Sequence, residues 1–170
     1  MKREHWRPAY IALGSNLQNP QVQVQRAFEE LRTLRDTQLL LRSALYATAP
    51  MGVTEQPPFV NAAAGLLTRL SARELLEALL AIERGMGRER RERWGPRVID
   101  LDLIWITGPP IDEPDLKVPH PGVPARNFVL YPLADIAPSL FLPGHGRVEE
   151  LAARVDSAGI RRLPQEGTSK

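Results

Sequence analysis

The sequence predicts an α+β fold of the ferredoxin-like type, in which an antiparallel sheet carries both of its helices on one face. Six segments follow one another in the order strand, helix, strand, strand, helix, strand, which is the split βαβ pattern. The chain has 170 residues, of which 43% are hydrophobic, so one domain can bury a core of its own. We therefore expect a single domain over residues 1–170, with an extension over 1–8 and a flexible tail over 156–170.

The first half of the chain holds a strand, a helix and a second strand. An apolar run at residues 10–13 stops at Gly14-Ser15-Asn16, which is typical of a buried strand followed by a turn. Residues 20–34 repeat apolar side chains at the three-and-four spacing of one helical face. Residues 39–46 follow as one strand.

A ten-residue connection over 49–58 separates the two halves, and its length favours a functional loop. A strand is expected at 59–67. Ser71 and Glu74 have the spacing of a capping box at the start of a helix, and Gly85 and Gly87 end that helix. The last strand of the pattern covers residues 98–106.

Beyond this strand the chain is rich in proline. Six prolines fall between Pro109 and Pro124, too many for a regular element, because proline lacks a backbone donor and fixes φ. Short helices are expected at 127–136 and near 149–155. With both helices on one face, the other face of the sheet would need the long loops and the proline-rich segment to cover or border it, which favours a cleft there.

Composition excludes several classes of protein. No apolar run approaches the length of a membrane span, and the first residues are too polar for a signal peptide. The chain has no cysteine, so any metal must be held by oxygen or imidazole. The net charge is only +2, which gives no general argument for nucleic acid. We expect a cytoplasmic protein, monomeric or weakly dimeric, that binds neither membrane nor nucleic acid.

Asp100 and Asp102 are the first candidate site. They are two apart in an expected strand, so both carboxylates point to one face while Leu101 and Leu103 point to the other. Two adjacent carboxylates repel, and a divalent cation relieves that repulsion. Magnesium favours one or two carboxylates together with substrate phosphates. The alternative is a pair of edge-strand aspartates that face water.

An arginine-rich loop precedes the aspartates. Six arginines lie between Arg84 and Arg97, in a stretch that also holds Gly87 and Gly95. Guanidinium groups match phosphate oxygens in geometry and charge. A solvated run of charges is the other interpretation, and Trp94 in this loop is either a lid for a planar ligand or a structural anchor.

Isolated polar residues give weaker indications. His120 lies between Pro119 and Pro121, which stiffen its backbone. The amide of Asn61, inside an apolar strand, suits the edge of a heterocycle, although a satisfied buried amide fits equally well. Glu83 lies near the C-terminal end of its helix, where the helix dipole disfavours a carboxylate.

Together these motifs resemble the 6-hydroxymethyl-7,8-dihydropterin pyrophosphokinase family of folate biosynthesis, from about residue 9 to 143. The family string of arginine, tryptophan, Gly-Pro-Arg, two apolar residues and Asp-Leu-Asp runs unbroken from Arg93 to Asp102. Weaker blocks agree with it at residues 12–17, at residues 48–52 with Asn61 downstream, and at residues 118–121 followed by Arg126, Phe128 and Pro132-Leu133.

The resemblance implies a transfer of diphosphate from ATP to the hydroxymethyl group of the pterin, with release of AMP and two magnesium ions as cofactors. It implies that Asp100 and Asp102 bind the metal and, with Arg90 and Arg93, are catalytic. It further implies an ATP site at Glu83, Arg88, Arg90, Arg93, Arg97, Leu103, His120 and Arg126, and a pterin pocket at Thr48, Ala49, Met51, Phe59, Asn61, Trp94 and Phe128.

The rival interpretation is a non-catalytic RNA-binding module, since ferredoxin-like sheets also carry RNA-recognition domains. Phe59 and Trp105 do not form the glycine-and-aromatic signature expected of such a module. Asp100 and Asp102 would repel an RNA backbone on their face. A phosphate-binding regulator that has lost catalysis is a third possibility.

Overall fold

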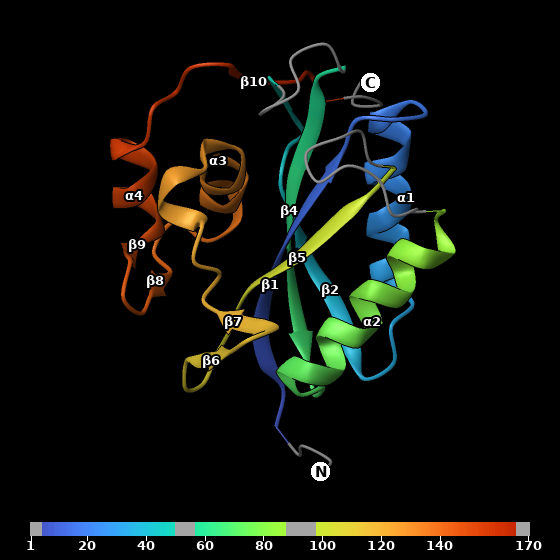
Figure 1. The fold of residues 1–170 in the computed structure, drawn as a ribbon, viewed down its shortest axis with the longest axis vertical. Coiled ribbons are helices and arrows are strands. Elements are labelled where there is room, and N and C mark those ends of the chain that lie inside the picture. The colour runs from blue at the N-terminus through green and yellow to red at the C-terminus, as the bar shows by residue number, and fades with distance from the viewer. Residues whose placement is uncertain (1–4, 50–56, 88–97, 166–170) are drawn as a thin grey trace.

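The computed structural model describes residues 5–49, 57–87 and 98–165. Helices cover an antiparallel sheet (Figure 1), in agreement with the predicted α+β class. The strands are β1 (Arg7–Ser15), β2 (Thr37–Arg42), β3 (Tyr46–Thr48), β4 (Phe59–Thr68), β5 (Asp100–Ile106), β6 (Ile111–Glu113), β7 (Leu116–Val118), β8 (Phe141–Leu142), β9 (Gly146–Arg147) and β10 (Ile160–Arg162). The helices are α1 (Pro20–Arg32), α2 (Ala72–Gly85), the 3-10 turn η1 (Val123–Ala125), α3 (Asn127–Ile136) and α4 (Val148–Arg154).

The main sheet is built around β4. One edge of β4 pairs with β1, and its other edge pairs with β2 over residues 64–68 and with β3 over residues 59–61. β5 extends the sheet beyond β1, and β10 extends it beyond β3. All of these pairings are antiparallel. The pairs β6–β7 and β8–β9 form two separate small hairpins.

α1 and α2 lie side by side on one face of the sheet, here called the helix face (Figure 1). α2 begins with the predicted capping box: the Glu74 N–H donates to Ser71 Oγ at 3.1 Å, and the Ser71 N–H donates to Glu74 Oε1 at 2.9 Å. Both helices bury their apolar stripes against the sheet, as the three-and-four spacing predicts. The fully buried side chains on these stripes include Val24, Phe28, Leu31, Leu75 and Leu79.

α3 lies on the opposite face, here called the α3 face, and α4 packs outside α3 (Figure 1). Tyr46 of β3 points to this face, since its ring meets Tyr131 of α3 edge-on at 6.4 Å between centroids. The side chain of Tyr46 is 6% exposed. A third helix therefore covers part of the face that the sequence assigns to loops.

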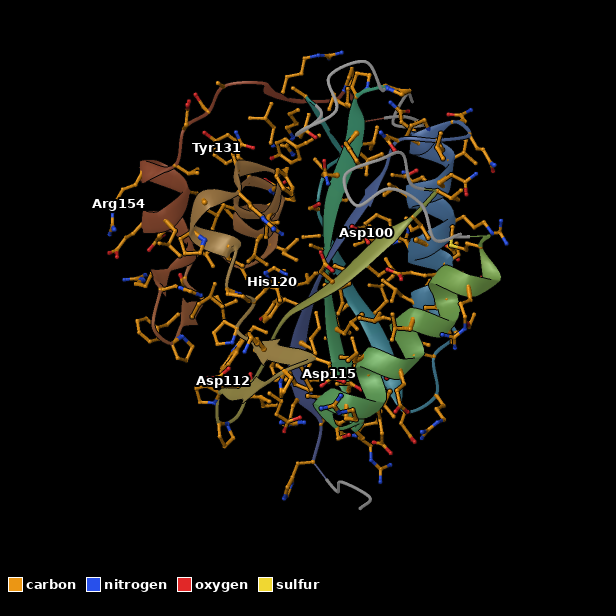
Figure 2. All side chains as sticks on the ribbon, in the orientation of Figure 1. Asp100, Asp112, Asp115, His120, Tyr131 and Arg154 are labelled. Carbon is orange, nitrogen blue, oxygen red and sulfur yellow. The ribbon has the colours of Figure 1, made fainter. Side chains whose placement is uncertain are left out.

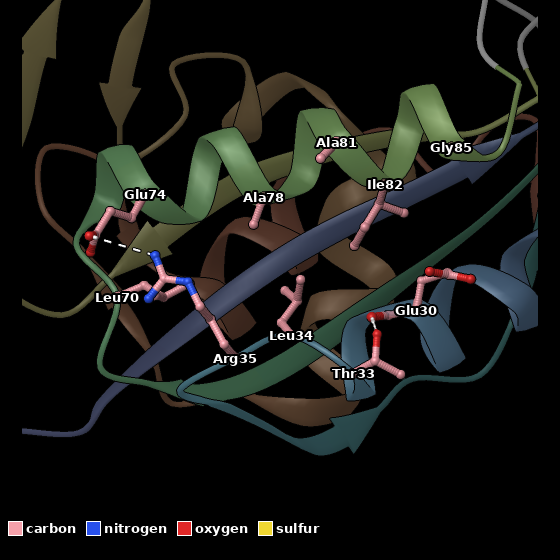
Figure 3. Close-up of a pocket in the computed structure, with 10 residues that line it drawn as sticks. All are labelled: Glu30, Thr33, Leu34, Arg35, Leu70, Glu74, Ala78, Ala81, Ile82 and Gly85. Atoms are coloured by element: carbon pink, nitrogen blue, oxygen red, sulfur yellow. Dashed lines mark hydrogen bonds and ion pairs between the residues drawn. The ribbon is translucent and has the colours of Figure 1, made fainter.

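A groove of about 380 Å³ opens on the helix face between α2 and the end of α1 (Figure 3). Arg35 and Glu74 bridge it with an Nη2–Oε2 distance of 3.8 Å. Its walls contain none of the residues that the sequence assigns to the site. They are Glu30, Thr33, Leu34, Arg35, Leu70, Glu74, Ala78, Ala81, Ile82 and Gly85.

The predicted strand over 39–46 is wrong as a single element, because the ladder is interrupted between β2 and β3. The N–H of Ser43 donates to the Ala63 carbonyl at 2.9 Å, but the Ala63 N–H donates to Ser43 Oγ at 2.8 Å. A side-chain oxygen thus takes the place of a backbone acceptor, and such local competition is typical of serine.

The proline-rich segment does contain regular structure. Its six prolines fall outside β6 and β7, with Pro114 in the turn that joins them. The strands therefore keep their donors.

Both ends of the described chain are more ordered than the sequence suggests. Arg7 and Pro8, assigned to an N-terminal extension, are already part of β1. Residues 160–162, assigned to a flexible tail, form β10 and pair with β3.

Candidate active site

Asp100 and Asp102 lie on one face of β5, as their spacing predicts, and that face is the α3 face. Both are half-buried, whereas Leu101 and Leu103 are 3% and 5% exposed. The sheet register sets Asp100 opposite Gly14 and Asp102 opposite Ala12 of β1. Directly opposed residues of an antiparallel pair point to the same face. The two carboxylates therefore share one surface with the alternate residues of β1.

The next strand across, β4, places Asn61 and Phe59 on that same surface. Gly14 is opposite Asn61, and Thr48 of β3 is opposite Phe59. Thr48 Oγ1 and Asn61 Oδ1 form a hydrogen bond of 2.7 Å, and Asn61 Nδ2 donates to the Leu13 carbonyl at 3.4 Å. These bonds fix the orientation of the amide. Among the described residues, one N–H of Nδ2 and one lone pair of Oδ1 remain without a hydrogen bond. Asn61 is thus both held and able to bind.

Gly14 makes room for this amide. A Cβ atom on Gly14 would lie 2.7 Å from Asn61 Nδ2, which is closer than non-bonded atoms approach. The sequence suggested a turn at Gly14, but the strand continues to Ser15. The demand for glycine depends on a contact with Asn61, 47 positions further along the chain, and no local pattern signals it.

His120 lies between β7 and α3, on the α3 side of the sheet (Figure 2). Its backbone N–H donates to the Ile104 carbonyl of β5 at 2.9 Å, so the segment is attached to the strand that carries the aspartates. The Gly122 N–H donates to His120 Nδ1 at 3.0 Å. In the neutral imidazole the proton must then reside on Nε2, which becomes a donor.

The environment of His120 favours the neutral form. Burial is the main cause that lowers the pKa of His120, and the charge of Arg126 lowers it further, while the Asp100 carboxylate acts in the opposite direction. The neutral His120 ring can still donate from Nε2 to a phosphate oxygen, although it adds no positive charge.

Arg126 and Phe128 flank the first residue of α3. The Arg126 guanidinium carbon lies 5.9 Å from the centre of the Phe128 ring, which is within cation–π range. A Cβ on Gly122 would lie 2.8 Å from the Arg126 guanidinium carbon. Gly122 therefore lets the arginine side chain pass close to the backbone, and no motif in the sequence marks this glycine.

Glu83 and Leu103 are the two described residues of the predicted ATP site that come from α2 and from the other face of β5. Glu83 is 3% exposed on α2, and its Oε2 accepts the Leu101 N–H at 2.7 Å. The side chain of Leu103 faces the helices. The structure thus places the Leu103 side chain on the helix face, behind the aspartates, and the Glu83 carboxylate at the outer edge of β5. Ala49, the neighbour of Thr48, donates its N–H to the Gly159 carbonyl at 2.9 Å.

The remaining predicted site residues fall outside the described ranges. They are Met51, Arg88, Arg90, Arg93, Trp94 and Arg97.

The donor set fits magnesium. Within residues 5–49, 57–87 and 98–165, no group of three or more His, Asp or Glu side chains has metal-site geometry. Two neighbouring half-buried carboxylates nonetheless match a cation that takes its other ligands from water and substrate phosphates.

Comparison with known proteins decides the family. Residues 10–138 match the family described as 7,8-dihydro-6-hydroxymethylpterin-pyrophosphokinase (HPPK). The chain belongs to the HPPK family. The matched range contains every residue of the candidate site and ends before β10.

Relatives named 2-amino-4-hydroxy-6-hydroxymethyldihydropteridine pyrophosphokinase match most of the chain. The protein from Pseudomonas aeruginosa is 49% identical over 155 residues, which cover 91% of this chain and 96% of that protein. The protein from Methylorubrum extorquens is 43% identical, with 91% and 98% covered. The Bacillus subtilis protein is 37% identical over 158 residues, with 93% and 91% covered.

Solved structures show the same fold. The chain resembles wild-type Plasmodium falciparum HPPK-DHPS with pteroate at a TM-score of 0.66 and 13% identity, over 90% of this chain and 43% of that one. The complex with STZ-DHP gives a TM-score of 0.68 at 13% identity, with 87% and 43% covered. This chain thus spans less than half of the length of these HPPK-DHPS proteins.

Proposed function

We propose that this HPPK-family chain transfers diphosphate from ATP to the hydroxymethyl group of 6-hydroxymethyl-7,8-dihydropterin, which gives AMP and the pterin diphosphate in folate biosynthesis. The main support is that Asp100, Asp102 and Asn61 lie on the same α3 face of the sheet. A pair of carboxylates suited to a cation thus lies two strands away from an amide suited to a heterocycle.

In the reaction, the hydroxymethyl oxygen attacks the β-phosphorus of ATP. The bond from the β-phosphorus to the oxygen that bridges it to the α-phosphorus breaks, and AMP leaves with that oxygen. The hydroxyl proton passes to water or to a phosphate oxygen. Catalysis of this kind relies on positioning and on neutralisation of charge.

Asp100 and Asp102 are assigned to hold magnesium, two ions in the full proposal, which supply positive charge to the phosphate oxygens when bound. His120 donates from Nε2 to a phosphate oxygen, and Arg126 adds a guanidinium beside it. Arg90 and Arg93 are assigned to the triphosphate and to catalysis, and Arg88 and Arg97 to ATP binding.

Thr48 and Asn61 are assigned to the polar edge of the pterin, and Phe128 stacks on its ring with Phe59 or Trp94 on the other side. Ala49 and Met51 complete this pocket. Because Asn61 Oδ1 is already engaged by Thr48, a ligand that reaches the pair meets a preset pattern of donors and acceptors.

The strand order β5–β1–β4, followed by β2 and β3, supports the finer assignment to the ferredoxin-like topology. Within the described ranges, no helix combines the length and apolar character needed to cross a membrane. We further propose that the protein is cytoplasmic and is a monomer or a weak dimer.

The test is a direct assay. The protein is mixed with ATP, magnesium and 6-hydroxymethyl-7,8-dihydropterin, and nucleotide products are separated. AMP formed in equal amount to pterin diphosphate supports the proposal. ADP as the sole nucleotide product, or no turnover together with binding to RNA, overturns it in favour of another kinase or of the RNA-binding alternative.

A further inference from the structure

Residues 156–163, here called the C-terminal strap, run along the whole of β3. Ile160 pairs with Thr48, and Arg162 pairs with Tyr46. Beyond these pairs, the Ala49 N–H donates to the Gly159 carbonyl at 2.9 Å, and the Leu163 N–H donates to the Leu45 carbonyl at 2.8 Å. Figure 1 shows the chain passing from α4 across to β10 beside the main sheet. A three-residue strand is thus paired on both edges.

The other end of the strap is attached to the beginning of α3 by a single side chain. Asn127 Nδ2 donates to the Asp156 carbonyl at 2.7 Å and to the Ala158 carbonyl at 3.0 Å. Ala158 also donates its N–H to Asp156 Oδ1 at 2.9 Å, which closes a turn under the amide. One amide group therefore holds two carbonyls of the strap.

The contact between Asn127 and the strap matters because of the residues on either side of Asn127. Asn127 lies between Arg126 and Phe128, which are assigned to the triphosphate and to the pterin ring. The strap also reaches Thr48 and Ala49, which are assigned to the opposite wall of the pterin pocket. It thus links two walls that come from distant parts of the chain.

The space at Gly159 agrees with a close fit. Gly159 has φ +76°, in the left-handed region, and a Cβ there would meet Ala49 Cβ at 3.2 Å. Both the backbone conformation and the room beside Ala49 favour glycine. The strap therefore packs closely against Ala49, the residue that follows β3.

The far end of α3 is attached to the segment around β3 directly, and the strap contacts the same carboxylate. Tyr46 Oη donates to the Asp135 carboxylate at 3.0 Å, and the Ala44 N–H donates to Asp135 Oδ2 at 3.1 Å. Arg162 of the strap lies 4.0 Å from the same carboxylate. The first turn of α3 is held by the packing of Val129 and Leu130 and, through the strap, by Asn127.

We propose that the C-terminal strap is a positioning device for the pterin pocket and that Asn127 is its positioning residue, which sets the distance between Phe128 and the Thr48 wall. The inference rests on the proposed function, since it assumes that these two walls enclose the pterin. Asn127 contacts the strap and acts on the substrate through Phe128. The strap lies beyond the residues that match the HPPK family.

The test compares Asn127→Leu with Gln23→Met. Both changes replace an amide by an apolar side chain of similar size. Gln23 lies on α1, and its amide also donates to a backbone carbonyl, that of Gln18, at 3.0 Å. For Asn127→Leu we expect the KM for the pterin to rise about tenfold, as for the loss of one to two hydrogen bonds. The KM for ATP should rise less than the KM for the pterin, since Phe128 lies inside the first turn of α3 whereas Arg126 precedes the helix. The value of kcat should change less than about twofold, and Gln23→Met should change neither KM.

Hydrogen exchange of the Ala49 amide gives a second reading that needs no turnover. In Asn127→Leu this amide should exchange about tenfold faster than in the wild type, because the strap that accepts its bond is released at its other end. In Gln23→Met its exchange should be unchanged.

The outcomes separate the two proposals. A wild type that forms no AMP contradicts the proposed function, and the Ala49 exchange then decides whether the strap is coupled to Asn127. An active wild type with an unchanged pterin KM in Asn127→Leu overturns the positioning role. So does an equal rise of both KM values with a lowered melting temperature, which indicates general destabilisation.

Discussion

The two faces of the sheet differ in what they bury. On the helix face, alternate residues of β1 and β5 are large and aliphatic, as Ile11, Leu13 and Leu101 illustrate, each at most 3% exposed. On the α3 face, the same strands present Gly14 and the two aspartates. A pleated strand allows both surfaces at once because its side chains alternate. One strand can therefore contribute large buried side chains to the core on one face. On its other face, small and polar residues leave room for a ligand.

The largest expected effect is on the α3 face. Asp100→Ala or Asp102→Ala should lower kcat in magnesium by about 10³-fold, because the charge that stabilises the transferring phosphate is lost. The free energy of unfolding should stay within about 0.5 kcal/mol, since removal of one carboxylate also removes a repulsion. Steady-state kinetics and thermal unfolding measure both.

Asp112→Ala is the matched control, since Asp112 is an exposed aspartate of β6 that pairs with Lys117 at 2.6 Å. It should leave kcat unchanged. Near-normal turnover in either β5 variant would contradict the metal assignment.

The residue between the aspartates should behave in the opposite way. Leu101→Ala should lower the free energy of unfolding by about 3 kcal/mol, because it opens a cavity against α2. The activity of the folded fraction should fall less than about tenfold. Denaturant unfolding measures the loss, and Leu101→Met, which keeps the volume, should cost less than about 1.5 kcal/mol. A Leu101→Ala protein of normal stability would mean that the helix face is not the core.

Gly14→Ala tests how finely the α3 face is fitted. The new methyl group must displace the Asn61 amide, so the KM for the pterin should rise about tenfold, equal to about 1.4 kcal/mol. Gly85→Ala is the control, because a Cβ at Gly85 meets nothing within 4 Å. If both variants keep the wild-type KM, Asn61 does not bind the pterin.

The smallest effect concerns pH. Burial, followed by the hydrogen bond to Asp135, raises the pKa of Tyr46 to about 12. Since the folded value exceeds the unfolded value of about 10, Tyr46 contributes stability that is complete below pH 10 and is lost as pH rises through 12. The difference in unfolding free energy between the wild type and Tyr46→Phe should therefore narrow from pH 10 to 12, as measured by denaturant titration. A constant difference would contradict the shifted pKa.

Local patterns in the sequence predicted the elements that local interactions determine. The capping box at Ser71 and Glu74 marks the start of α2, and the spacing of Asp100 and Asp102 places both on one face. Each of these inferences needs only a period or a short motif.

Features that depend on distant contacts were missed. β10 exists because β3 offers a free edge to residues 160–162, and three residues carry no periodicity of their own. The break at Ser43 depends on a hydrogen bond to Ala63. The close approach of Arg126 to Gly122 arises only when the arginine folds back over it. The residues whose need arises from distant contacts are thus harder to predict than those that a short motif marks.

The outer edge of β5 has a consequence for solubility. An edge strand with unpaired backbone groups is a template for aggregation with another chain. Here the Leu101 N–H is bonded to Glu83 and the Ile104 carbonyl to the His120 N–H. Both groups are occupied by the protein's own α2 and by the segment before η1. The strand that carries the aspartates is therefore protected at these two groups against growth of the sheet, and one of the two contacts also holds His120 beside it.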